Sequence, residues 1–217
     1  MTLTKFLPLV LALSALTARA DDGNADCRMR GMYTNDVYGF SVVIPLDHVA
    51  CPNSPLGMVE HGLVVELGEG WKRNIEAYAG YNSTEYIDLP DVAEGSKDLL
   101  DDDLPKNAVT EISRSAAHLG GLPAIRIVLR FPGEENSGPM IQDEVSALRK
   151  VIPEGKVPSH LYSLRLTTLE ARYAEDRKVF EKMLASWQEL ATDDDPPSGQ
   201  SAPTATQPAP QKKGRLH

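Results

Sequence analysis

No apolar run in this chain is long enough to cross a membrane as a helix. The longest, Phe6–Leu16, falls short of the roughly 20 residues that a bilayer of about 30 Å requires. It follows Lys5 and precedes Ala18-Arg19-Ala20, the small-x-small pattern of a cleavage site. We therefore predict a cleaved signal peptide at residues 1–20 and a soluble periplasmic or secreted protein, with no membrane insertion of the mature chain.

Cysteine is equally scarce, with Cys27 and Cys51 the only two. Zinc sites need four ligands, and redox pairs usually stand two residues apart, so this pair indicates neither site. Disulfides persist in the oxidising compartments that exported proteins reach. We expect a structural Cys27–Cys51 disulfide, worth roughly 3–4 kcal/mol on the chain-entropy model.

Catalytic and metal-binding motifs are missing too. The chain has no Walker lysine motif, G-x-S-x-G elbow or H-E-x-x-H sequence, and its five histidines are scattered. Arg73 replaces the third glycine of a dinucleotide fingerprint that Gly68 would begin, and Asp101–Asp103 lacks EF-hand spacing, so we interpret it as a solvated loop. We predict no catalytic residue, no metal and no cofactor, although a triad assembled from distant residues stays open.

Positive charge is in deficit. The net charge is −9, and loss of a leader that holds two positive residues and no acid would leave −11. Such a surface disfavours nucleic acid and anionic lipid as partners. The negative charge of the chain is typical either of a protein that is simply kept soluble or of one that binds a basic partner.

The last residues, 192–217, hold almost no large apolar side chain and are rich in proline, alanine and threonine. Such a segment cannot bury enough surface to offset its ordering entropy, so we predict a disordered tail. Residues 22–191 then form one domain.

Apolar and polar residues alternate in seven segments, the pattern of antiparallel strands with one packed and one wet face. The segments lie at residues 40–44, 63–67, 74–79, 108–118 (the weakest), 125–131, 141–147 and 162–167. One helix is expected from Asp91 as N-cap through Leu100. A longer one follows a Thr167-x-x-Glu170 capping box and reaches Leu190, with Trp187 on its apolar side. We predict an α+β fold, an antiparallel sheet of about six to seven strands packed against helices, with a long C-terminal helix.

Aromatic residues are few, thirteen in all, but Trp71, Tyr78, Tyr81 and Tyr86 stand close together. Tyrosine and tryptophan are frequent anchors of recognition surfaces, so these four are the candidate partner-binding residues. The alternative is that they pack on strand ends beneath the middle helix.

Three stretches carry a family resemblance. They are Tyr33-Thr34-Asn35 with Tyr38-Gly39-Phe40-Ser41 and Ile44-Pro45, then Leu119-Gly120-Gly121-Leu122-Pro123-Ala124, and finally Tyr162–Thr168 with Met183–Trp187. In this order they resemble the PsbP-like superfamily, named for an extrinsic photosystem II subunit. The resemblance implies an antiparallel sheet flanked by helices. The cysteine pair and Pro45-Leu46-Asp47-His48, in place of a usual P-x-x-W, depart from the family pattern, and no site residue can be transferred.

These observations favour an exported, non-catalytic binding module that contacts a protein partner in the cell envelope. Two alternatives remain. One is a periplasmic immunity or inhibitor protein whose acidic surface neutralises a basic toxin or hydrolase. The other is an envelope enzyme with a dispersed site.

Overall fold

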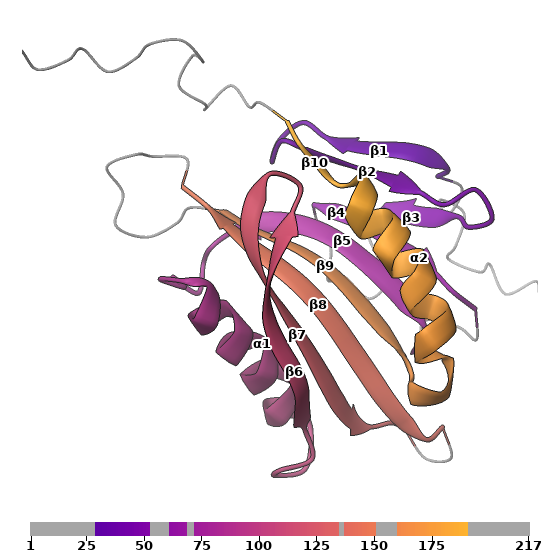
Figure 1. The fold of residues 1–217 in the computed structure, drawn as a ribbon, viewed down its shortest axis with the longest axis vertical. Coiled ribbons are helices and arrows are strands. Elements are labelled where there is room, and N and C mark those ends of the chain that lie inside the picture. The colour runs from indigo at the N-terminus through magenta and orange to yellow at the C-terminus, as the bar shows by residue number, and fades with distance from the viewer. Residues whose placement is uncertain (1–28, 53–60, 69–71, 135–136, 151–159, 191–217) are drawn as a thin grey trace, which may run out of the picture.

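A computed structural model describes residues 29–52, 61–68, 72–134, 137–150 and 160–190 (Figure 1). The strands are β1 (Gly31–Asn35), β2 (Phe40–Ile44), β3 (Ala50–Pro52), β4 (Gly62–Glu66), β5 (Asn74–Tyr81), β6 (Thr110–Leu119), β7 (Leu122–Pro132), β8 (Pro139–Arg149), β9 (His160–Leu169) and β10 (Gln188–Glu189). The helices are α1 (Leu89–Asp103) and α2 (Tyr173–Ser186), with the 3-10 turn η2 (Glu170–Arg172) before α2. The α+β class is therefore confirmed.

The strands form two antiparallel sheets. The larger has the order β3-β4-β5-β9-β8-β7-β6, and the smaller has the order β1-β2-β10. Each of the seven alternating segments corresponds to a strand, and the weakest one, at 108–118, is β6. Strands β1, β3 and β10 were not predicted. β3 and β10 have only three and two residues, and in β1 the adjacent Met32 and Tyr33 break the alternation.

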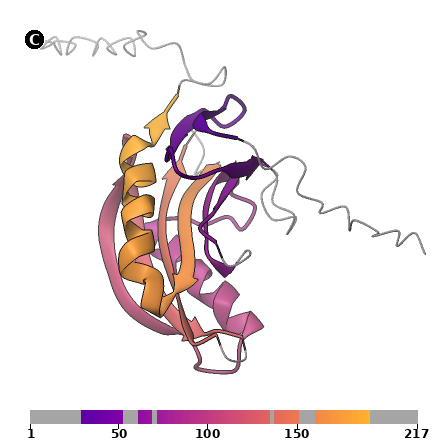
Figure 2. The same cartoon turned by 90° about the vertical axis from the view of Figure 1, so that its right-hand side faces the viewer.

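The two helices cover opposite faces of the larger sheet (Figure 2). On one face, Phe180 and Met183 of α2 join the main core with Leu164 of β9. On the other, Ala93 of α1 packs with Ile127 and Leu129 of β7 in a smaller cluster. Adjacent residues of a strand point to opposite faces, so each strand contributes to both layers.

The expectation of one wet face is wrong for β8. Gln142, Glu144 and Ser146 alternate with apolar residues, yet they are only 5%, 2% and 2% exposed. Both the Gln142 amide and the Ser146 hydroxyl donate to the Glu144 carboxylate, at 3.0 and 2.8 Å. Buried polar groups are tolerated where they satisfy one another in this way.

The chain leaves the last helix at Trp187, three residues before the predicted end, and β10 then pairs with β2. Trp187 is the C-cap and is 4% exposed. Its ring stacks on Phe40, with centroids 4.5 Å apart and planes 2° from parallel. The predicted capping box does not form, because Thr167 lies within β9 and no side chain caps η2 or α2.

The three family-like stretches meet around this tryptophan. Phe40 comes from the first stretch, and Trp187 ends the third. Gly120 of the second lies in the β6–β7 turn with φ +61°, where an added Cβ would stand 3.0 Å from the Trp187 ring. One packing centre thus accounts for aromatic and glycine residues that are far apart in sequence.

Helix α1 begins earlier and ends later than predicted. Asp88, not Asp91, is the N-cap, and its carboxylate accepts from the Asp91 amide at 3.0 Å. The Asp91 carboxylate reaches back to the Ile87 amide, also at 3.0 Å. Asp101–Asp103, expected in a loop, form the last turn of the helix.

Candidate functional site

The structure separates the candidate partner-binding residues. Trp71 lies outside the described residues. Tyr86 packs against α1, where a Cβ added at Gly95 would stand 2.2 Å from its hydroxyl. Tyr78 of β5 is half-buried, on the face of the larger sheet that α1 covers. Tyr81 is 72% exposed at the end of β5, and among the three candidates that the structure describes it alone has an exposed side chain.

Tyr81 belongs to a group of four rings that we call the aromatic cluster: Tyr38, His61, Tyr81 and His160. His160 stacks on Tyr81, with centroids 5.3 Å apart and planes 29° from parallel. Tyr38 lies edge-on to Tyr81 at 5.7 Å and to His160 at 5.3 Å, and 4.8 Å from His61. Such tilted and offset contacts are the favourable geometries for aromatic pairs.

Hydrogen bonds from neighbouring strands hold the aromatic cluster in place. The Asn35 side chain accepts from the Tyr38 amide at 3.0 Å and donates to the His61 carbonyl at 3.1 Å. The Tyr162 hydroxyl donates to the Tyr38 carbonyl at 2.7 Å. Tyr81 and His160 are register partners on β5 and β9. The neighbouring side chains of the aromatic cluster therefore hold the exposed Tyr81 ring in a preorganised position.

Sequence reasoning missed three of these four rings. The histidines looked scattered, and no spacing rule joins positions 38, 61 and 160. The available signal was Asn35 with Tyr38 in the first family-like stretch, since asparagine commonly hydrogen-bonds the backbone of a turn. The partners of that turn are set by sheet order, which the sequence alone does not reveal.

A second group of polar side chains lies on the face of the larger sheet that α1 covers: Glu76, Tyr78, Glu144 and Arg165. Arg165 donates to Glu144 at 3.1 Å and to the Tyr78 hydroxyl at 2.9 Å, and pairs with Glu76 at 3.5 Å. Burial raises the pKa of Tyr78 to about 12. Burial likewise raises the pKa of Glu76, against the pull of Arg165.

Glu144 behaves in the opposite way. Burial is the largest influence and opposes its ionisation, but Arg165 and the hydroxyls of Ser163 and Ser146 together hold its pKa below the usual value. Ser163 and Ser146 both donate to it at 2.8 Å. With its acceptors occupied, this carboxylate is a structural charge rather than a general base.

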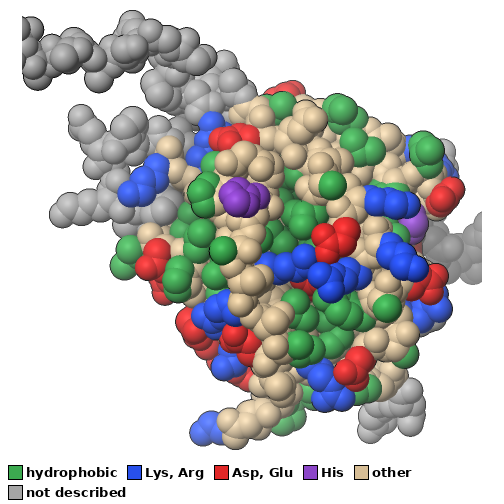
Figure 3. Space-filling view, viewed as in Figure 1, with side chains coloured by type: hydrophobic (Ala, Val, Ile, Leu, Met, Phe, Trp, Pro, Cys, Tyr) green, Lys and Arg blue, Asp and Glu red, His purple; other side chains and the backbone are tan. Residues whose placement is uncertain are grey.

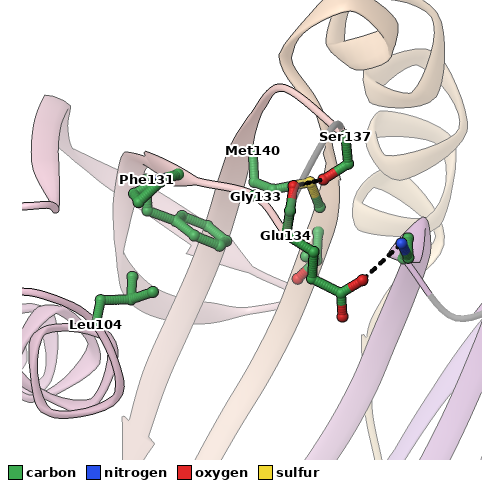
Figure 4. A pocket seen from close by; sticks show the side chains of 9 residues that line it. Leu104, Phe131, Gly133, Glu134, Ser137 and Met140 are labelled. Atoms are coloured by element: carbon green, nitrogen blue, oxygen red, sulfur yellow. Dashed lines mark hydrogen bonds and ion pairs between the residues drawn. The ribbon is translucent and has the colours of Figure 1, made fainter.

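A cavity of about 480 Å³ opens at the other end of β5 and β9 from Tyr81 (Figure 4). Its lining residues are Lys72, Leu104, Phe131, Pro132, Gly133, Glu134, Ser137, Met140 and Thr167. Most of this lining is apolar, and Lys72 pairs with Glu134 at 2.6 Å. Sequence reasoning did not identify this cavity, because it forms where the β7–β8 turn meets the end of α1.

The described residues contain neither a metal-binding cluster nor a membrane-spanning helix. No group of three or more His, Cys, Asp or Glu side chains there is placed to hold a metal ion. Across the same ranges, no helix combines the length and apolarity needed to span a bilayer. On the face that carries α2, acidic and basic side chains are interspersed (Figure 3).

Comparison with known proteins supports the architecture. No family model matches the chain, and no curated protein matches it in sequence. The solution structure of cyanobacterial PsbP (CyanoP) from Synechocystis sp. PCC 6803 matches with a TM-score of 0.51 and 14% identity, over 81% of this chain and 99% of that one. LpqN of Mycobacterium tuberculosis is involved in cell envelope biogenesis. Its crystal structure matches with a TM-score of 0.50 and 16% identity, over 70% of this chain and 83% of that one. The chain therefore has a PsbP-like fold.

Proposed function

We propose that this protein is an exported, non-catalytic binding module that contacts a protein partner in the cell envelope through Tyr81 and the aromatic cluster. The observation that carries the proposal is a tyrosine ring that is 72% exposed yet held by His160 and Tyr38. A rigid tyrosine supplies a large contact area at low entropic cost, which is why tyrosine is enriched at binding hot spots.

Export and the disulfide are part of the same proposal. Cys51 is 3% exposed in β3. Met29 and Ala50 exchange backbone hydrogen bonds of 3.1 and 2.9 Å, which brings the chain two residues after Cys27 next to the strand of Cys51. Cys27 and the leader at 1–20 lie outside the described residues. A disulfide here would favour an oxidising compartment, and the involvement of LpqN in cell envelope biogenesis supports an envelope setting for a protein of this fold.

The test is site-specific photo-crosslinking in the living host. A photoreactive residue replaces Tyr81 in one strain and Leu46, which is 88% exposed outside the aromatic cluster, in another. We expect one envelope protein to be captured at position 81 and not at position 46. With that protein purified, Tyr81→Ala should weaken binding at least about tenfold, and Leu46→Ala should leave it unchanged.

Two results would reject the proposal: the same capture pattern at both positions, or an unaltered affinity of Tyr81→Ala. The identity of the captured protein separates the alternatives. A basic hydrolase whose activity this protein blocks would favour the inhibitor hypothesis. Turnover of an envelope substrate by the purified protein would favour the enzyme.

A further inference from the structure

The cavity described above is independent of the aromatic cluster. Its walls bring together Leu104 after α1, Phe131 and Pro132 of β7, and Met140 of β8 (Figure 4). Its volume of about 480 Å³ lies within the roughly 300–1,000 Å³ range of ligand sites. A single large apolar side chain would fit there and lose much of its contact with water.

The end of α1 that leads to Leu104 is strongly acidic. Asp101, Asp102 and Asp103 form its last turn, and no basic residue stands in that turn. Negative charge at a helix C-terminus opposes the helix dipole, so this arrangement does not serve helix stability. Asp102 and Asp103 are exposed, which leaves their charge available to a ligand.

The other charged side chains near the cavity do not neutralise the three aspartates. Glu134 is 76% exposed and already neutralises Lys72. Lys106, two residues after Leu104, is exposed. Arg73 and Arg130, which neighbour the lining residues Lys72 and Phe131 in sequence, are each paired with an acid, Asp176 and Glu170. Four acids against two lysines leave this region with a net negative charge.

We propose that the cavity binds a segment of a partner protein in which a large apolar side chain is flanked by lysine or arginine. The apolar walls take the anchor, and Asp101–Asp103 attract the flanking cations. The same acids disfavour anionic lipid and fatty acid. This site goes beyond the proposed contact at Tyr81, from which it is separated by the length of β5.

The probe is a fluorescent synthetic peptide, Lys-Lys-Ala-Trp-Ala-Lys-Lys, titrated with the purified protein by fluorescence anisotropy. Combined Asp101→Asn, Asp102→Asn and Asp103→Asn should weaken binding about tenfold at about 20 mM salt. That difference should shrink to about twofold at about 0.5 M salt, where charges are screened. The matched control neutralises three exposed acids away from the cavity, Asp36→Asn, Asp47→Asn and Glu85→Gln, and should change little.

Two further measurements test the apolar anchor. Replacing the peptide tryptophan with alanine should weaken binding about tenfold, and so should Leu104→Trp, which fills the cavity. Folding is checked by thermal melting, where neutralising Asp101–Asp103 should leave α1 intact or slightly more stable. Tyr81→Ala should leave peptide binding unaltered, so failure at one site is distinguishable from failure at the other.

Equal binding of a peptide with glutamates in place of lysines would overturn the proposal, and so would full affinity of the neutralised protein. Saturable binding of dodecyl maltoside without binding of the peptide would assign the cavity to a lipid-like ligand and overturn it as well.

Discussion

At the scale of single residues, Glu76 carries a pH-dependent cost. Burial raises its pKa, so the folded state binds the proton more tightly than the unfolded state does. The contribution of Glu76 to folding stability is therefore fully present below its ordinary pKa. This contribution is lost as the pH rises through the raised pKa of the folded state. Glu76→Gln should therefore raise the urea midpoint at about pH 7.5, with the gain fading towards about pH 4.

The control for this measurement is Glu85→Gln, at an exposed position, which should change the urea midpoint little at either pH. A lower urea midpoint for Glu76→Gln at neutral pH would contradict the interpretation. It would mean that the ion pair of Glu76 with Arg165 outweighs the cost of burying the charge.

Trp187 is a core residue whose loss should destabilise the fold strongly. It is 4% exposed and stacked on Phe40, so Trp187→Ala removes core contacts and leaves a cavity. We expect about 3–5 kcal/mol of destabilisation in denaturant unfolding. Leu46→Ala, at an exposed position, should stay within about 0.5 kcal/mol of the wild type. A loss below about 1 kcal/mol at Trp187 would show that its contacts are dispensable.

Residue-level prediction succeeded where a signal was local and failed where it was not. The inward position of Trp187 followed from helical spacing and was confirmed. The burial of Glu144 did not follow, because alternation shows that it faces away from Val145 but not what covers that face. The aromatic cluster depends on contacts across strands whose order is not written in any short stretch.

At the scale of elements, the start of α1 shows how two acids compete to cap one helix. The rule for N-caps selected Asp91, but Pro90 prefers the first turn, which moves the cap back to Asp88. Asp91 then serves the reciprocal role by binding the Ile87 amide. Pro90 is therefore a local signal that this helix begins before Asp91.

The β6–β7 turn gives an element-level prediction. Gly120 has φ +61° and stands against Trp187 and the Glu189 amide, so a side chain there is strained and crowded. Gly120→Ala should destabilise the protein by about 1–3 kcal/mol in thermal or urea unfolding. Gly80→Ala is the matched control, since a Cβ there meets nothing within 4 Å. Equal effects of the two substitutions would refute the packing argument.

At the scale of the whole molecule, the pattern of strands and helices in the sequence was enough to predict the α+β class. Together with the short motifs, it was also enough to predict a PsbP-like architecture. CyanoP shares that architecture at 14% identity, which is why short motifs spread over the chain were more informative than overall similarity. Partner chemistry could not be predicted in the same way, because Tyr81 and the cavity lie at opposite ends of one strand and combine residues from several elements.

The disulfide is also a prediction for the whole molecule. If Cys27 and Cys51 are joined, reduction frees the N-terminal end of the described chain and should lower the melting temperature by several degrees, as roughly 3 kcal/mol implies. The measurement is a thermal melt with and without reductant, beside mass spectrometry of the exported protein. Two free thiols in that material would reject the disulfide.

The pairing of β10 with β2 has a consequence for how the protein is made. Val43 donates to the Ser186 hydroxyl at 2.9 Å across 143 positions, and the Leu190 amide donates to Gly39 at 2.8 Å. The β1–β2 hairpin, which is synthesised well before α2 and β10, must therefore wait for them before its sheet is complete. Such long-range closure slows folding. During that interval β2 presents an unpaired edge, the feature through which sheets add further strands.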